Sequence, residues 1–182
     1  MFRSIKNFSQ TRFCWLLLFL LSIGLEGSGL YFQYGLHLDP CVNCVYERAY
    51  ILGFLLAGII GIFLASFWPF RLIAVLTLLA SSVGGIVIAI EHLQSYTTAS
   101  NLFSASCKLA PSFPSYLKLD EWLPWMFKAS GNCGPLDWSF MTLNMPQWLV
   151  IIFGCGIMAS VLMLLSFFVR TQRRSIYDRY YR

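Results

Sequence analysis

The residues whose type and spacing best suit chemistry in this sequence are four of its six cysteines. Cys41 and Cys44 follow Pro40 as a Cys-x-x-Cys pair. Two thiols at this spacing close a small, somewhat strained ring, and the motif favours a lowered thiolate pKa, so the pair is readily reduced. Cys107 and Cys133 stand in a later stretch that is rich in proline, serine and glycine. The Cys-x-x-Cys pair is therefore suited to thiol–disulfide exchange.

Each pair of cysteines also has a simpler interpretation. Half of a zinc site has the same Cys-x-x-Cys spacing, but a structural zinc ion needs two further ligands close together. Cys107 and Cys133 are far apart in the sequence, so we expect no metal. Taken alone, their stretch is typical of one ordinary structural disulfide. Cys14 and Cys155 lie within apolar runs, where a free thiol behaves as a small apolar group, and we expect both to be structural.

An arginine follows the Cys-x-x-Cys pair at a spacing that matters in a helix. If a helix begins near Cys44, then Cys44 and Arg48, four residues apart, share a face. A guanidinium in that place would stabilise a thiolate and attract an electron-rich carbonyl acceptor. The alternative is an arginine at a membrane boundary that extends toward water, paired with Glu47.

The rest of the sequence is that of a membrane protein. Its 182 residues are 58% hydrophobic and 12% charged, against roughly 45–50% and about 25% in an ordinary soluble domain. A soluble monomer and a disordered chain are both excluded. Four runs without Lys or Arg, each about 20 residues long, can cross a hydrocarbon core about 30 Å thick, where only helices satisfy their own backbone. These predicted spans are Phe13–Gln33, Ala49–Phe67, Leu72–Ile90 and Trp148–Val169.

The basic residues indicate which way the spans cross. Most of the 13 Lys and Arg residues lie at the two termini and in the turn between the second and third spans, namely Arg3, Lys6, Arg12, Arg71, Arg170, Arg173, Arg174, Arg179 and Arg182. By the positive-inside rule, both termini are cytoplasmic and the connections 34–48 and 91–147 face outward. The four candidate cysteines then share an oxidising side. Because the basic residues act as an orientation signal, we expect no nucleic-acid partner despite the net charge of +5.

Other features refine the predicted topology. Trp15, Trp68 and Trp148 fall at span ends, as interfacial anchors do. Glu26 is the only charged residue within a predicted span, and it marks either function or a protonated carboxyl bonded to a neighbouring helix. A secretory signal peptide is the competing interpretation of the first span, but no Ala-x-Ala-like site is present. Residues 116–127 are too short and too charged to span, but amphipathic enough to lie at the membrane interface.

Together these motifs resemble the DsbB family, bacterial inner-membrane enzymes that reoxidise the periplasmic thiol oxidase DsbA. The resemblance covers nearly the whole chain. It rests on the four spans and on segments in the same order, which are Pro40-Cys41-x-x-Cys44, Tyr46-Glu47-Arg48, Glu91-His92, Glu121-Trp122-Leu123-Pro124, Ser130-Gly131-Asn132-Cys133 and Met145-Pro146-Gln147-Trp148-Leu149. The fold that we expect is an all-α membrane protein, a single four-helix bundle over residues 1–182 with two periplasmic loops and a short interfacial helix in the second.

The resemblance also implies a route for electrons. Reduced DsbA would attack Cys107 of a Cys107–Cys133 disulfide, Cys133 would attack Cys41, and Cys44 would remain as a thiolate beside a bound quinone, either ubiquinone or menaquinone. It further implies that the residues near the quinone are Arg48, Glu47, His92 and Met145. Two rivals stay open: a four-span scaffold stapled by its disulfides, and an enzyme like the vitamin K epoxide reductases, in which the Cys-x-x-Cys pair belongs to a late span.

Overall fold

The structure is a computed structural model that describes residues 11–98, 113, 118–131 and 139–168. Four long helices dominate these residues, and all four are long and apolar enough to cross a membrane. They are α2 (Arg12–Leu30), α3 (Val42–Leu64), α4 (Trp68–Thr98) and α7 (Met145–Phe168), and α2 continues into a π-helical turn, η1 (Tyr31–Gly35). The predicted class, a four-helix membrane bundle, is confirmed.

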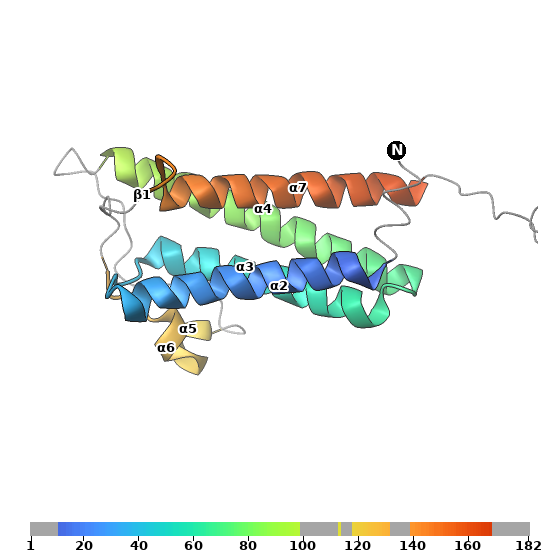
Figure 1. Ribbon diagram of the computed structural model, residues 1–182, viewed down its shortest axis with the longest axis horizontal. Coiled ribbons are helices and arrows are strands. Elements are labelled where there is room, and N and C mark those ends of the chain that lie inside the picture. The colour runs from blue at the N-terminus through green and yellow to red at the C-terminus, as the bar shows by residue number, and fades with distance from the viewer. Residues whose placement is uncertain (1–10, 99–112, 114–117, 132–138, 169–182) are drawn as a thin grey trace, which may run out of the picture.

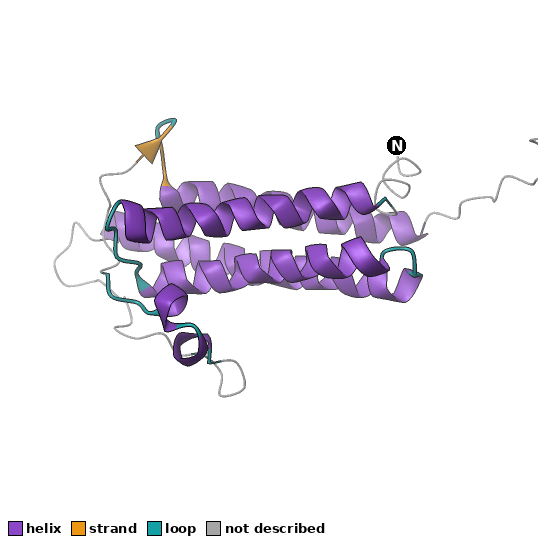
Figure 2. Ribbon diagram, turned by 60° about the horizontal axis from the view of Figure 1, so that its bottom comes forward, coloured by secondary structure: helices purple, strands orange, loops and turns teal. Residues whose placement is uncertain are grey.

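The four helices run side by side along one common direction (Figure 1). Helix α3 packs against α2 and α4, and α4 packs against α7. The start of α2, the turn between α3 and α4, and the end of α7 lie at one end of the bundle (Figures 1 and 2). The connection between α2 and α3 lies at the opposite end. The residues that follow η1 therefore meet the start of α7 at a single end of the molecule.

Two one-turn helices and a small hairpin lie at the end of the bundle where α2 connects to α3. The one-turn helices α5 (Leu119–Trp122) and α6 (Pro124–Phe127) follow each other beside α2 and α3 (Figure 1). Met126 and Phe127 are buried against Val45 of α3, whereas Trp122 and Trp125 are 62% and 53% exposed. The predicted interfacial segment is thus two short turns with apolar residues directed into the bundle and two outward tryptophans, which suits a membrane interface.

A small hairpin leads into α7. Strand β1 (Ser139–Phe140) pairs antiparallel with β2 (Leu143–Asn144). The two turn residues, Met141 and Thr142, have φ angles of 50° and 67°, as a two-residue hairpin turn requires. The Trp148 indole donates a hydrogen bond to the Phe140 carbonyl oxygen at 3.1 Å. The hairpin is therefore fixed over the first turn of α7.

Helix α3 begins at Val42 instead of Ala49, the start of the predicted span. Its first turn is capped by Cys41, whose sulfur accepts a hydrogen bond from the Cys44 backbone N–H at 3.3 Å. Apolarity alone misses these residues, because the helix here carries Glu47 and Arg48, both of them buried. The expectation that Glu26 is the only charged residue within a membrane helix is wrong for the same reason.

The opposite end of the bundle is held by apolar packing around Trp15. The Trp15 side chain has no exposed surface, and a Cβ atom added at Gly61 of α3 would overlap its ring. The prediction of an interfacial anchor at Trp15 is therefore wrong, because a glycine on the facing helix opens room for the whole indole inside the bundle. Trp68, by contrast, is 68% exposed at the start of α4.

Candidate redox site

The site is built on the first turn of α3. Cys41 caps the helix and Cys44 lies one turn later, so their sulfurs face each other at 2.8 Å as free thiols. Cys41 is only 3% exposed. A Cys-x-x-Cys pair at a helix N-terminus places both sulfurs near the positive end of the helix dipole, which favours a thiolate.

The pKa of Cys41 responds strongly to this environment. Hydrogen bonding to the Cys44 thiol, with smaller contributions from His92 and from the Cys44 backbone N–H, lowers the pKa of Cys41 to about 4, although burial acts in the opposite direction. The site therefore favours the thiolate form of Cys41. A thiolate is the species that attacks in disulfide exchange.

A histidine from α4 lies against both sulfurs. His92 Nε2 is 3.6 Å from Cys41 Sγ and 4.0 Å from Cys44 Sγ. Its other ring nitrogen, Nδ1, is 3.0 Å and 3.1 Å from the two carboxylate oxygens of Glu47. Both side chains are almost fully buried, at 1% and 2% exposure. The carboxylate thus fixes the ring with Nε2 toward the thiols.

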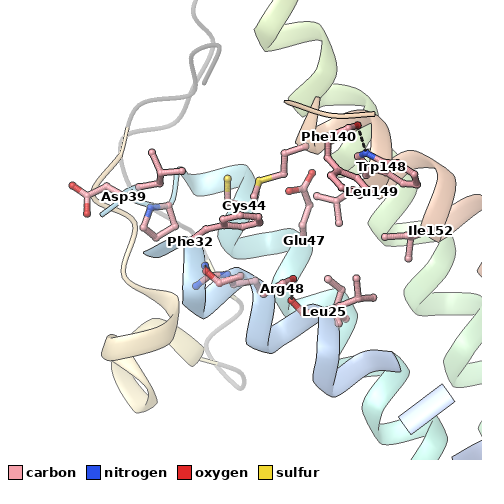
Figure 3. A pocket seen from close by; sticks show the side chains of 16 residues that line it. Leu25, Phe32, Asp39, Cys44, Glu47, Arg48, Phe140, Trp148, Leu149 and Ile152 are labelled. Carbon is pink, nitrogen blue, oxygen red and sulfur yellow. Dashed lines mark hydrogen bonds between the residues drawn. The ribbon is translucent and has the colours of Figure 1, made fainter. Parts of the chain in front are cut away.

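A cavity of about 360 Å³ opens beside the dithiol. Cys44, Glu47 and Arg48 line it from α3, and Phe32 lines it from η1 (Figure 3). The rest of its wall is mostly apolar and comes from α2, from the α2–α3 connection, from the hairpin and from the first two turns of α7. These lining residues include Leu25, Leu38, Phe140, Met145, Trp148, Leu149 and Ile152. One reactive sulfur and one cation therefore face a largely apolar space.

Arg48 is held in the wall by acceptors from three other segments. Its guanidinium donates to the Gly29 carbonyl oxygen at 2.6 Å, to Gln33 Oε1 at 2.7 Å and to the Met126 carbonyl oxygen at 3.1 Å. A Cβ atom added at Gly29 would lie only 3.0 Å from Arg48 Nε. The charge is thus fixed by α2, η1 and α6, and Gly29 leaves the room for it.

The chain after α6 is tied to the chain just before the thiols. The backbone N–H groups of Ser130 and Gly131 both donate to the Pro40 carbonyl oxygen at 3.1 Å. A Cβ atom added at Gly131 would overlap the Asp39 carbonyl oxygen, so only glycine permits this approach. The segment that leads toward Cys133 in the sequence is therefore docked on the segment that leads into Cys41.

The predicted site residues fall into three groups. Cys44, Glu47, Arg48 and Met145 line the cavity together. Cys41 and His92 are also brought to the site: the His92 ring, which was predicted near the quinone, lies against the two sulfurs, and neither residue is in the cavity wall. Cys107 and Cys133 lie outside the described residues, as do most of the basic residues used for the orientation.

Some features of the site had no signal in the sequence. Gly29, Phe32 and Gln33 were not predicted, because an apolar run with one glutamine gives no sign that one of its faces lines a cavity. Thiol and imidazole donors of Cys41, Cys44 and His92 also lie within 4.8 Å of one another. This set is one donor short of the four found in structural zinc sites.

Glu26 remains apart from this arrangement. Its carboxyl is only 6% exposed, and its two oxygens have no hydrogen-bond partner among the described residues. It lies on α2 next to Leu25, which lines the cavity, but is not itself in the cavity wall. The hydrogen bond from Glu26 to a neighbouring helix, one of the two alternatives for this residue, is therefore not seen among the described residues.

These features define a multi-pass helical membrane protein that carries a dithiol beside an apolar cavity. Comparison with known proteins gives the family. The family model described as "Disulfide bond formation protein DsbB" matches residues 11–163. The chain belongs to the DsbB family, and its redox role lies in disulfide bond formation.

Individual relatives match over nearly the whole length of both chains. Disulfide bond formation protein B of Photorhabdus laumondii is 41% identical over 170 residues, which cover 92% of this chain and 98% of the relative. The protein of the same name from Histophilus somni is 38% identical over 175 residues, 96% and 97% of the two chains. That of Idiomarina loihiensis is 38% identical over 180 residues, 97% and 99% of the two chains.

Proposed function

We propose that this chain is a thiol:quinone oxidoreductase that reoxidises a periplasmic DsbA-type dithiol oxidase and passes the electrons to ubiquinone or menaquinone in the membrane. The observation that carries the proposal is the position of Cys44, which belongs to a buried thiol pair and lines an apolar cavity of about 360 Å³. A disulfide that served only as a structural cross-link would not need such a cavity beside it.

The residues of the cavity suit a quinone. A bound quinone would supply an oxidant that takes up two electrons and two protons. The cavity volume lies within the range of small-molecule sites, which are mostly apolar with a few placed polar groups. Phe32, Leu149 and Ile152 provide apolar surface, while Arg48 provides a fixed cation for a carbonyl oxygen.

The two thiols do the chemistry on the protein side. The Cys41 thiolate attacks the Cys44 sulfur, so that one S–S bond forms while two electrons leave through Cys44 toward the cavity. The Cys44 proton leaves with them, and the second proton is the one that Cys41 gave up when it became a thiolate, so two electrons and two protons balance the conversion of a quinone to a quinol. The 2.8 Å contact between the sulfurs means that this bond forms with little movement of the backbone.

The second cysteine pair would link this site to the partner protein. The partner dithiol attacks Cys107 of a Cys107–Cys133 disulfide, and the freed Cys133 then reduces Cys41–Cys44 by attack on Cys41. This order comes from the family resemblance. It is supported by the docking of Gly131, two positions before Cys133 in the sequence, on Pro40, the residue before Cys41.

The proposed location is the bacterial inner membrane, with the thiol end in the periplasm. Arg12 begins α2 and Arg71 lies in the first turn of α4, so both are at the end of the bundle opposite the thiols (Figure 1). The positive-inside rule then assigns the arginine end to the cytoplasm.

The test is oxidation of a purified DsbA-type dithiol by the full-length protein in lipid nanodiscs with a short-chain ubiquinone. We expect oxidation only when the quinone is supplied, and none with Cys44→Ser. Cys155→Ser is the matched control, because Cys155 is also a free thiol but is exposed on α7, and it should retain full turnover. Unchanged turnover in Cys44→Ser would overturn the proposed function.

A further inference from the structure

Glu47 and His92 form a buried pair that lies between the Cys41 sulfur and the cavity. His92 Nε2 contacts Cys41 Sγ at 3.6 Å, whereas its Nδ1 contacts the Glu47 carboxylate at 3.0 Å. Glu47 lines the cavity and His92 does not. The chain of contacts therefore runs from the thiol, through the imidazole, to a carboxylate that faces the cavity.

Oxidation of the dithiol has to move protons as well as electrons. Both thiol protons must leave as the S–S bond forms, and bulk water is not available to a side chain as buried as Cys41, which is 3% exposed. A base must then lie within reach of the sulfur. Among the described residues, His92 is the histidine in contact with it, and Glu47 is the carboxylate hydrogen-bonded to that histidine.

We propose that His92 and Glu47 form a proton relay between Cys41 and the cavity. This inference rests on the proposed function. His92 Nε2 takes the proton of Cys41, and the imidazolium that forms is paired with the Glu47 carboxylate. When Cys41 attacks Cys44 and two electrons leave through Cys44, the Nδ1 proton passes to Glu47, which lines the cavity where a quinone would accept it.

The bonds, electrons and protons of this step balance. Two S–H bonds break, one S–S bond forms, and two electrons and two protons reach the quinone. One of those protons passes through His92 and Glu47, and the other comes from Cys44, which itself lines the cavity. The partner dithiol loses two electrons and two protons in its own oxidation, so the relay is protonated again when Cys41–Cys44 is next reduced.

Other ionisable groups around the relay have separate places. From α3, Cys44 contacts Cys41, and Arg48 points to Gly29, Gln33 and Met126. Glu26 on α2 is within electrostatic reach of Arg48, and Glu91 of α4 is exposed. Helix α7 contributes no Asp, Glu, Lys, Arg or His to the site. His92 and Glu47 are therefore the groups whose removal should change proton transfer from Cys41.

The first readout does not use quinone. In the reduced full-length protein, alkylation of Cys41 by iodoacetamide is followed against pH, and peptide mass distinguishes Cys41 from Cys44. The wild-type protein should react as a thiolate down to about pH 4, the pKa of Cys41. In His92→Gln the midpoint should move upward, because the thiolate loses its cationic partner.

The second readout is reduction of a short-chain ubiquinone in a single turnover of the reduced protein. At neutral pH, we expect a fall of about 100-fold in His92→Gln and about 10-fold in Glu47→Gln, within the range for loss of a general base. Raising the pH should recover most of the rate, since the thiol then ionises without help. The apparent quinone affinity should stay unchanged in His92→Gln. Glu91→Gln is the matched control, because Glu91 is the exposed carboxylate directly before His92.

Each result decides one part of the inference. A wild-type alkylation midpoint in His92→Gln overturns the relay, and so does a loss of rate that high pH does not recover. An unchanged rate in Glu47→Gln overturns the role of Glu47. If the wild-type protein reduces no quinone while the midpoint still moves in His92→Gln, the proposed function fails and the thiol-to-imidazole transfer stands. Glu47→Gln keeps the size of the side chain, so it tests the relay even if His92→Gln does not fold.

Discussion

The two ends of the helical bundle bury different kinds of side chain. At the dithiol end, several polar or ionisable side chains are buried beside apolar ones, and most of them are paired, with Glu47 on His92 and Arg48 on three carbonyl-type acceptors. At the opposite end, the buried cluster consists of Cys14, Trp15, Ala65, Ala74, Val75 and Met163. A buried polar group costs stability unless it is paired. The comparison indicates that the dithiol end supports chemistry, while the apolar end holds the helices together.

One charged group at the apolar end sharpens this contrast. Arg71 is only 6% exposed, and its guanidinium carbon lies 4.6 Å from the centre of the Phe167 ring. Its Nε has no hydrogen-bond partner among the described residues. Arg48 donates three hydrogen bonds from a comparable depth. An arginine fixed by three hydrogen bonds, with N–H donors to spare, suits recognition of a ligand, and a stacked one suits packing.

The comparison predicts the largest effect at Arg48. Arg48→Met removes a buried cation that donates three hydrogen bonds, and hydrogen bonds to charged groups contribute about 1.5–3 kcal/mol each. We expect the apparent KM for quinone to rise by about 100-fold while the KM for the partner dithiol changes little. Steady-state kinetics with each substrate varied in turn checks this. An equal loss of both affinities would instead support a boundary arginine without a role at the cavity.

Substitutions at the apolar end should lower the stability of the protein and leave its turnover unchanged. In Gly61→Ala, the new methyl group would overlap the Trp15 ring, so α2 and α3 must separate slightly. Overpacking of this kind costs about 1–3 kcal/mol, and thermal unfolding should show a lower Tm. Gly154→Ala on α7 is the matched control, since a Cβ atom there has no neighbour within 4 Å. Loss of turnover at unchanged Tm in Gly61→Ala would break the distinction between the two ends.

A smaller effect is expected where the outer chain docks beside the dithiol. Gly131→Ala would force the new methyl group against the Asp39 carbonyl oxygen and weaken the two hydrogen bonds to Pro40. Electron transfer from the partner dithiol should slow by about 10-fold, equivalent to about 1.4 kcal/mol, while reduction of quinone by the pre-reduced Cys41–Cys44 pair stays unchanged. Ser130→Ala keeps both backbone N–H groups and serves as the control. If both steps slow equally, the docking acts on the site as a whole.

The smallest effect should be at the surface of α5. Lys118 and Glu121 form an ion pair at 2.7 Å, with side chains that are 44% and 60% exposed. Exposed pairs of this kind contribute little to stability. Lys118→Gln should leave both Tm and turnover unchanged in standard assays. A clear fall in turnover would show that α5 takes part in the exchange reactions.

The sequence predicted the helices well and the site only in part. Apolar runs determine the four spans, because a lipid-facing backbone leaves no alternative to helix. The start of α3 was placed too late, because Glu47 and Arg48 break the apolar pattern while finding their partners on α2, α4 and α6. Those partners are set by packing between helices that are distant in sequence. For the same reason, no local pattern pointed to Gly29 or Gln33 as the residues that fix Arg48.

The most direct test of the account is a single turnover that isolates the Cys41–Cys44 pair. A Cys107→Ser, Cys133→Ser protein, reduced and freed of reductant, is mixed anaerobically with a short-chain ubiquinone, and absorbance reports quinone reduction while peptide mass reports the disulfide. We expect one quinone reduced for each protein molecule, together with a new Cys41–Cys44 disulfide. No reduction of quinone, or the same yield after Cys44→Ser is added, would contradict it.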